Sequence, residues 1–238
     1  MIWSYLKLFL RKKLNWLLFA GLIFFQVVEI GGNSIGGDIG EVLMIARSVN
    51  VFALFLTPVF CFWNYSAYQV CSEIKFLVRM GSPFSYTVWY LKLTLLNSLM
   101  YVVFSNFIVI TANLIKLGDI SGISNVLILV LLQFIYYVNC ALLYFLVVTN
   151  LHDKQPLGFL AVVFYGVWDL IGQQCYNLNI PWVNISVSYV VGFPDYLSNQ
   201  LFFVKSFSVL LGTCLALYGL CAILIEKKDF MEWGKSHG

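Results

Sequence analysis

Six long apolar segments alternate with shorter polar segments along the chain. An α-helix needs about 20 apolar residues to cross a bilayer core of roughly 30 Å, and these segments are close to or above that length. The predicted spans are residues 14–30, 47–68, 84–115, 123–149, 157–172 and 201–225. Within the second span, Thr57-Pro58 predicts a kink, because proline lacks the N–H group that continues a helix. The pattern therefore predicts an all-α, polytopic membrane protein with six transmembrane helices.

The segments at the ends of these spans differ in character. Residues 1–13 mix aromatic and aliphatic side chains with four cations, which is typical of a helix lying in the cytoplasmic membrane interface. Residues 173–200 are too long for a plain turn and are interrupted by Pro181 and Pro194, so we expect short helices that re-enter the outer leaflet. Residues 226–238 form a charged tail, and no segment suggests a second domain, so residues 1–238 are predicted to be one membrane domain.

Residues 68–92 are the most polar segment between two long apolar runs, and residues 71–82 within it form the predicted charged helix. Four positions in it recur at i, i+3, i+4 and i+7, the spacing of one helix face: Ile74, Leu77, Val78 and Gly81. Charged residues occupy other faces: Glu73, Lys75 and Arg79. The pattern predicts a short amphipathic helix through which a soluble partner moves the two spans beside it. The alternative interpretation is an ordinary charged loop on the lipid surface.

A sharp break is predicted between this helix and the third span. Gly81 is typical of a helix end, Ser82 of an N-cap, and Pro83 of the first position in the next helix. The third span is therefore expected to start directly after the charged helix.

The distribution of Lys and Arg predicts the orientation of the chain. With a cytoplasmic N-terminus, 11 of the 14 cations lie on the inner side, and the outer side holds only Arg47, Lys116 and Lys205. We therefore predict that both termini, residues 71–82 and the turn at residues 150–156 are cytoplasmic. Residues 173–200 are predicted to face outwards.

Composition narrows the classes of function. The chain of 238 residues is 61% apolar and 11% charged, with a mean hydropathy of +0.87, whereas soluble domains carry roughly 25% charged residues. The six cysteines include no Cys-x-x-Cys pair, and His152 and His237 are the only histidines, so we predict no disulfide framework and no metal site. Phosphate-loop, zinc-protease and serine-hydrolase motifs are absent from the sequence, so we predict no catalytic residue. We also predict no nucleic-acid partner.

Two sets of polar residues within the spans are candidate functional residues. Placing an ionisable side chain at the middle of a bilayer costs about 2.5–3.5 kcal/mol of insertion free energy. Asp169, in the fifth predicted span, is therefore expected to have a structural or functional role. Asp169 either forms an ion pair with Arg47 or Lys205 that holds helix ends together, or it binds a substrate or serves as a proton-binding site. In the third span, three asparagines are candidates: Asn97, Asn106 and Asn113. Asparagines in lipid usually bond to a neighbouring helix, and lining of a translocation path is the alternative.

The order of these elements resembles the type-2 permeases of ATP-binding cassette (ABC) exporters. A basic N-terminal helix and two spans are followed by a charged helix and by a turn that matches that family's Pro-containing turn loosely, at Ser82, Pro83, Phe84, Ser85 and Trp89. The family's usual Glu-Arg-x-x-Gly run is not intact, since only its charges remain, in Glu73-Ile74-Lys75 and Arg79-Met80-Gly81. Residues 173–200 resemble the re-entrant helices that precede the family's last span, and residues 227–230 resemble its short charged ending.

The resemblance implies a function for the charged helix. In such permeases it is the coupling helix that contacts a separate ATPase subunit, and the residues in its place here are Glu73, Ile74, Lys75, Leu77, Val78 and Arg79. ATP and Mg²⁺ would bind to that ATPase, and this chain would hold no cofactor of its own. Its further partners would be a second copy of the permease, or a related one, and membrane lipid.

Small aromatic-rich permeases of this class resemble the self-immunity exporters for bacteriocins and lantibiotics in Gram-positive bacteria. The resemblance therefore implies a multi-pass protein of the bacterial cell membrane that moves a hydrophobic or amphipathic substrate, such as an antimicrobial peptide or a lipid-like compound. Two other functions stay open from the sequence. One is an ATP-independent, membrane-embedded ligand-binding or immunity protein, and the other is a secondary carrier.

Overall fold

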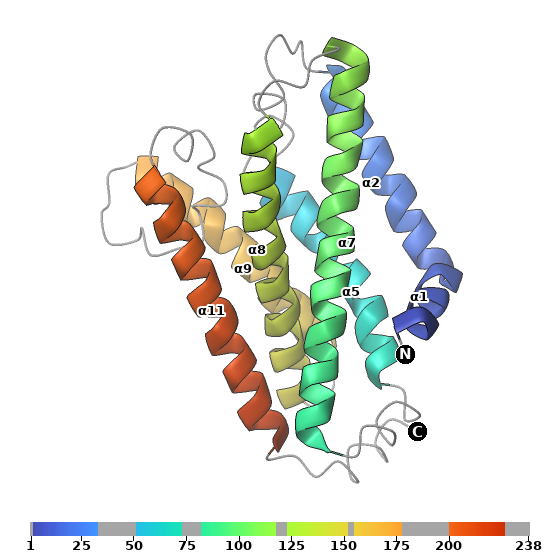
Figure 1. Ribbon diagram of the computed structural model, residues 1–238, viewed down its shortest axis with the longest axis vertical. Helices are drawn as coiled ribbons and strands as arrows, with labels where there is room; N and C mark the ends of the chain where they lie inside the picture. Colours follow the sequence, from blue (N-terminus) through green and yellow to red (C-terminus); the bar gives the residue numbers. More distant parts are fainter. Residues whose placement is uncertain are drawn as a thin grey trace.

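The computed structural model describes residues 2–32, 51–72, 82–117, 123–151, 155–177 and 200–226 (Figure 1). The elements in these ranges are α1 (Ile2–Arg11), α2 (Lys13–Gly32), the π-helical stretch η1 (Phe52–Leu56), α5 (Thr57–Ser72), α7 (Pro83–Leu117), α8 (Ile123–Asn150), α9 (Gln155–Asn177) and α11 (Gln200–Glu226). All regular structure in the described ranges is helical, which confirms the all-α prediction for this part of the chain.

Each predicted span coincides with a helix that begins or ends within a few residues of the expected boundary. In the part of the chain that the structure describes, three stretches are long and apolar enough to cross a membrane: Phe84–Phe107, Leu127–Asn150 and Ser206–Glu226. Two further apolar helices are shorter, Lys13–Val28 and Gln155–Trp168. Residues 73–81, most of residues 173–200, and the tail after Glu226 lie outside the described ranges.

The helices form a bundle with α8 at its centre (Figure 1). Helix α8 lies between α7 and α11 and also contacts α5 and α9, which are drawn behind it. Helix α2 runs beside α7, and α1 crosses next to α5 at the side of the bundle. From α2 to α11, consecutive helices alternate in direction, whereas α2 and α7, which pack side by side, run in the same direction (Figure 1).

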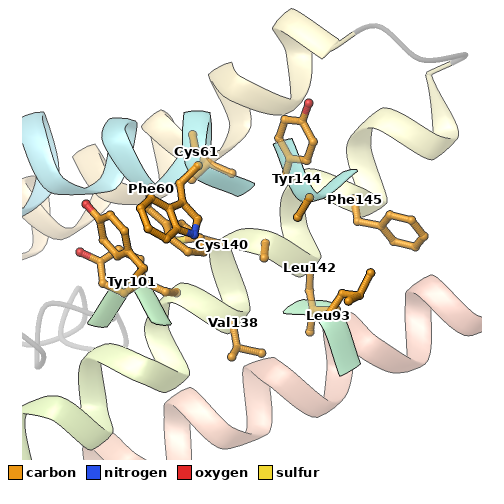
Figure 2. Packing of buried hydrophobic residues seen from close by; sticks show 14 of the residues in the cluster. Phe60, Cys61, Leu93, Tyr101, Val138, Cys140, Leu142, Tyr144 and Phe145 are labelled. Atoms are coloured by element: carbon orange, nitrogen blue, oxygen red, sulfur yellow. The ribbon is translucent and has the colours of Figure 1, made fainter. Parts of the chain in front are cut away.

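Aromatic rings fill the interior where α5, α7 and α8 meet (Figure 2). The rings of Phe60, Tyr101 and Tyr137 come from these three helices and form a triangle. Their centroids are 5.1 Å apart for Phe60–Tyr101, 4.6 Å for Phe60–Tyr137 and 5.0 Å for Tyr101–Tyr137. Cys61 and Cys140 are buried beside them, as Figure 2 shows. Tilted and edge-on ring pairs of this kind add to the stability that burial alone provides.

The kink predicted at Thr57-Pro58 falls where the helix changes type. The stretch before it, η1, is π-helical, and α5 starts at Thr57 with Pro58 as its second residue. The helical structure is continuous across this junction, so Pro58, which cannot donate a backbone hydrogen bond, follows directly on a stretch in which the α-helical bonding pattern is already changed. At the junction, the Tyr101 hydroxyl donates to the Leu56 carbonyl oxygen at 2.8 Å, and Thr57 Oγ1 lies 3.4 Å from the Tyr136 hydroxyl. Side chains from α7 and α8 thus satisfy polar groups at this junction.

The start of α7 confirms the predicted cap. The helix begins at Pro83, and the backbone N–H of Ser85 donates to Ser82 Oγ at 3.2 Å. This is the bond by which an N-cap serine satisfies an unpaired N–H group in the first turn. Ser82 Oγ also lies 2.9 Å from Ser85 Oγ, so both serines of the Ser-Pro-x-Ser sequence take part.

Helix α1 turns into α2 at Lys12, and the turn is held by side chains that follow it. Asn15 Nδ2 donates to the Phe9 carbonyl oxygen at 2.6 Å, and Trp16 Nε1 donates to the Leu10 carbonyl oxygen at 2.7 Å. Both acceptors belong to the last turn of α1, whose carbonyl groups have no partner within the helix itself. The N-terminal helix is therefore fixed at a defined angle to α2.

Candidate functional site

A continuous chain of buried hydrogen bonds is centred on Asn97 of α7. Asn97 Oδ1 accepts from the Tyr5 hydroxyl of α1 at 3.2 Å and from Trp63 Nε1 of α5 at 2.5 Å. Asn97 Nδ2 donates to Asn64 Oδ1 at 3.3 Å, and Asn64 Nδ2 donates to the Tyr90 hydroxyl at 3.4 Å. We refer to these five residues as the Asn97 cluster.

The Asn97 cluster connects four helices. Tyr90 passes the chain on to α8, because its hydroxyl donates to the Ala141 carbonyl oxygen at 3.2 Å, and its ring stacks on Phe145 with a centroid separation of 3.8 Å. Each of the five side chains is at most 1% exposed. Buried amide and hydroxyl groups that lose their partners cost free energy. The cluster therefore defines how α1, α5, α7 and α8 lie relative to one another.

A second set of amides links the central helix to its two neighbours. Asn106 Nδ2 of α7 donates to Gln133 Oε1 of α8 at 2.8 Å and also to the Val102 carbonyl oxygen at 2.8 Å. On another face of α8, Asn139 Nδ2 donates to the Leu210 carbonyl oxygen of α11 at 3.1 Å. These bonds join α8 to α7 and to α11, and they match the way in which polar side chains hold helices together in lipid.

Some buried polar atoms on α7 and α8 make no hydrogen bond within the described ranges. Within the described ranges, Thr94 Oγ1 and Ser98 Oγ on α7, and Gln133 Nε2 and Asn139 Oδ1 on α8, have no hydrogen-bond partner. Helices α7 and α8 pack against each other. Burying a polar group without a hydrogen bond costs free energy of folding. These atoms are therefore suited to bind water or a polar group of a ligand.

The structure describes only some of the residues that the sequence singled out. Asn97 and Asn106 bond to neighbouring helices, while the side chain of Asn113, on α7, lies outside the described residues. Asp169 and Lys205 belong to α9 and α11, but their side chains are not among those described. Arg47 and the six proposed coupling residues, Glu73, Ile74, Lys75, Leu77, Val78 and Arg79, lie outside the described ranges. The Asp169 ion pair and the coupling helix stay predictions.

Sequence reasoning missed most members of the Asn97 cluster. It considered asparagines in the third span only, although Asn64 and Asn139 are also amides within apolar runs. The same rule, applied to every span, would have found them. No sequence signal points to Tyr5, because its role depends on how α1 folds back against α5 and α7.

An apolar groove on the surface is a second candidate for ligand binding. It has a volume of about 480 Å³ and lies between the end of α8 and the first half of α9. Its lining is entirely apolar: Val147, Leu151, Leu157, Leu160, Ala161, Val163, Phe164 and Val167. Ligand sites usually add a few converging polar groups that orient the ligand, and this groove offers none. The Asn97 cluster and the nearby polar atoms are therefore the stronger candidate site.

In the part of the chain that the structure describes, no group of three or more His, Cys, Asp or Glu side chains comes together. The residues of the Asn97 cluster can make and exchange hydrogen bonds inside an apolar bundle.

Comparisons of the chain with models of protein families, with curated proteins and with solved structures found no match.

Proposed function

We propose that the chain is the membrane-spanning permease subunit of an ATP-driven exporter, with a separate ATPase subunit as its partner. The observation that carries the proposal is the course of α7. This helix begins at the Ser82 cap, directly after the charged residues 73–81, and runs without a break through Asn97 and Asn106 to Leu117. A displacement at its cytoplasmic start would therefore reach the Asn97 cluster about 20 Å away, at 1.5 Å per residue.

The first turns of α7 are well placed to carry such a displacement. Tyr86, Thr87 and Tyr90 are each at most 2% exposed, so the start of the helix is packed into the bundle. An ATPase that pushes on residues 73–81 would act on α7 and, through Tyr90 and Asn97, on α1, α5 and α8. The bonds of the Asn97 cluster are the elements that such a movement would rearrange.

The proposal includes six membrane crossings, a second permease copy or a related permease, and a hydrophobic or amphipathic substrate such as an antimicrobial peptide. The apolar, aromatic interior supports a substrate of this class, and the unused polar atoms of α7 and α8 would bind its polar groups. ATP and Mg²⁺ would act in the ATPase partner.

Replacing Leu77 with aspartate tests the proposal. The change places a charge in the proposed ATPase contact and leaves every proposed span intact, so we expect normal membrane insertion with loss of ATPase association and of transport or resistance. Co-purification from mild detergent, followed by a resistance or transport assay, measures both. Met231→Asp is the matched control, because Met231 lies in the charged tail that is predicted to be on the same side of the membrane and outside the proposed contact.

Two outcomes decide against the proposal. If the Leu77→Asp protein still recruits an ATPase and still transports, residues 73–81 are a surface loop. If the wild-type chain recruits no ATPase but binds a ligand, the ATP-independent binding or immunity protein is the better interpretation.

Labelling of introduced cysteines tests the topology on which the proposal depends. The cation bias predicts that Lys235→Cys is shielded from a membrane-impermeant maleimide in intact cells and reacts after permeabilisation. Asp195→Cys, in the segment predicted to face outwards, should react in intact cells. Both signals are compared with the wild-type background of native cysteines. Labelling of position 235 from outside would reverse the topology and remove residues 73–81 from the ATPase side.

A further inference from the structure

The corner between α1 and α2 presents cations and apolar side chains together on its outer surface. Arg11 and Lys13 are exposed, and three large apolar side chains beside them are also exposed: Leu10 at 45%, Leu14 at 41% and Trp16 at 59%. We call these five residues the basic corner. Such a surface is suited to bind an amphipathic partner that has both a negatively charged group and an apolar chain.

The basic corner is held rigidly from the inside. Tyr5 and Phe9, on the opposite face of α1, are fully buried, and Phe9 packs on Trp63 with a centroid separation of 4.9 Å. Lys12, between the two exposed cations, turns inwards instead, and its Nζ donates to Gln69 Oε1 of α5. The inner side of α1 is therefore committed to the bundle, and the exposed side chains of the corner present a defined surface.

The charges around the corner favour an anion. Residues 1–28 contain four cations and no Asp or Glu. The last carbonyl groups of α1 also form the negative end of a helix dipole, which stabilises Arg11, the last residue of that helix. In the part of the chain that the structure describes, the exposed side chains of Arg11 and Lys13 can meet an anion from outside, whereas Lys12 is bonded to Gln69.

We propose that the basic corner binds the headgroup of an anionic phospholipid, with the acyl chains of that lipid lying against Leu10, Leu14 and Trp16. A neutral lipid would leave the cations unmatched, and a soluble anion would leave the apolar side chains in water. Tryptophan is favoured at this depth of a membrane, because its ring is apolar and its N–H group is polar. The predicted topology places the corner at the cytoplasmic leaflet, where anionic lipids attract basic segments. Lipid binding at this corner does not depend on the transport proposal.

Native mass spectrometry of the purified full-length chain tests the inference. The protein is incubated in mixed micelles with equal amounts of dioleoyl-phosphatidylglycerol and dioleoyl-phosphatidylcholine, and the lipids that it retains are counted. We expect the wild-type chain to retain phosphatidylglycerol preferentially. In Arg11→Gln/Lys13→Gln, the preference should fall by about fivefold for each cation removed at low ionic strength, and added salt should weaken the wild-type preference.

Two variants serve as controls, and size-exclusion chromatography first establishes that each protein is folded. Arg11→Lys/Lys13→Arg keeps both charges and should keep the preference, even where the glutamine variant folds poorly. Lys92→Gln removes an exposed cation from α7 and should leave the preference unchanged. The inference is overturned if the glutamine variant retains phosphatidylglycerol as the wild type does, or if Lys92→Gln lowers it equally. Competition by water-soluble glycerophosphate at the same concentration would also overturn it, because it would indicate a site for soluble anions.

Discussion

Replacing Gly158 with valine is expected to force α9 away from α8 and to lower the stability of the bundle far more than the same substitution at Gly21, Gly212 or Gly219. A Cβ atom at position 158 would lie 2.5 Å from Val148 Cγ2 and 2.8 Å from ring carbons of Tyr144. Real Cβ contacts are essentially never this short. The glycine therefore permits the close approach of the two helices, as small residues do at helix interfaces in membranes.

The neighbours of Gly158 have little room to move aside. Val148 is fully buried and β-branched, and the Tyr144 ring packs edge-on against Phe159 at a centroid separation of 5.5 Å. Overpacking of a core costs about 1–3 kcal/mol, and occasionally more. We expect Gly158→Ala to fall within that range and Gly158→Val to exceed it, measured as the loss in thermal stability in detergent.

Gly212→Val on α11 is the matched control. No atom lies within 4 Å of a Cβ atom built at Gly212, so the same substitution meets open space. A change of this kind usually alters stability by no more than about 0.5 kcal/mol. Equal stability of the two valine variants would mean that α8 and α9 do not pack as closely as described.

Replacing Asn97 with leucine is expected to destabilise the protein by about 2–4 kcal/mol. The substitution removes three buried hydrogen bonds at once, those of Asn97 to the Tyr5 hydroxyl, Trp63 Nε1 and Asn64 Oδ1. At the average of about 0.6 kcal/mol per hydrogen bond in a membrane protein, the loss is about 2 kcal/mol. It rises towards about 4 kcal/mol if the partners stay buried and unpaired, because each then loses its hydration without compensation. Thermal unfolding in detergent measures the loss.

Neighbouring positions on α7 give the control for Asn97. Thr94 and Ser98 are equally buried, but their hydroxyl oxygens have no hydrogen-bond partner among the described residues. Thr94→Val and Ser98→Ala should therefore leave stability unchanged or raise it slightly. A double-mutant cycle with Tyr5→Phe completes the test. The loss from Tyr5→Phe should disappear in the Asn97→Leu background, whereas strictly additive losses would mean that Tyr5 and Asn97 do not interact.

Local features of the fold could be predicted from the sequence because they depend on neighbouring residues. The apolar runs gave helix boundaries to within a few residues, and α7 begins at Pro83, where Ser82 was expected to be the cap. The change of helix type at Thr57-Pro58 lies where a kink was predicted, because proline lacks the N–H group that continues a helix. These features need no information about which helices pack together.

The candidate site could be predicted only in part. An asparagine in an apolar run signals a bond to a neighbouring helix, and the sequence pointed to Asn97 and Asn106 for that reason. It could not name their partners. Tyr5 lies 92 positions from Asn97 in the chain, and the two meet because α1 folds back at Lys12. Gln133 likewise meets Asn106 only because α7 and α8 are antiparallel neighbours.

By itself, the sequence determined that the chain forms apolar helices and, to within a few residues, where the described helices start and end. The orientation of the chain in the membrane stays a prediction from its cations. Only the tertiary structure decided which helix lies at the centre. Helix α11 is the most apolar of the three long candidate spans, yet 17% of its most apolar stretch is buried, against 67% for α8. In water, apolarity predicts burial, because only the protein interior is free of water. In a bilayer, the lipid tails are as apolar as the interior, so burial follows from close packing and from polar contacts such as those of Asn97, Asn106 and Asn139.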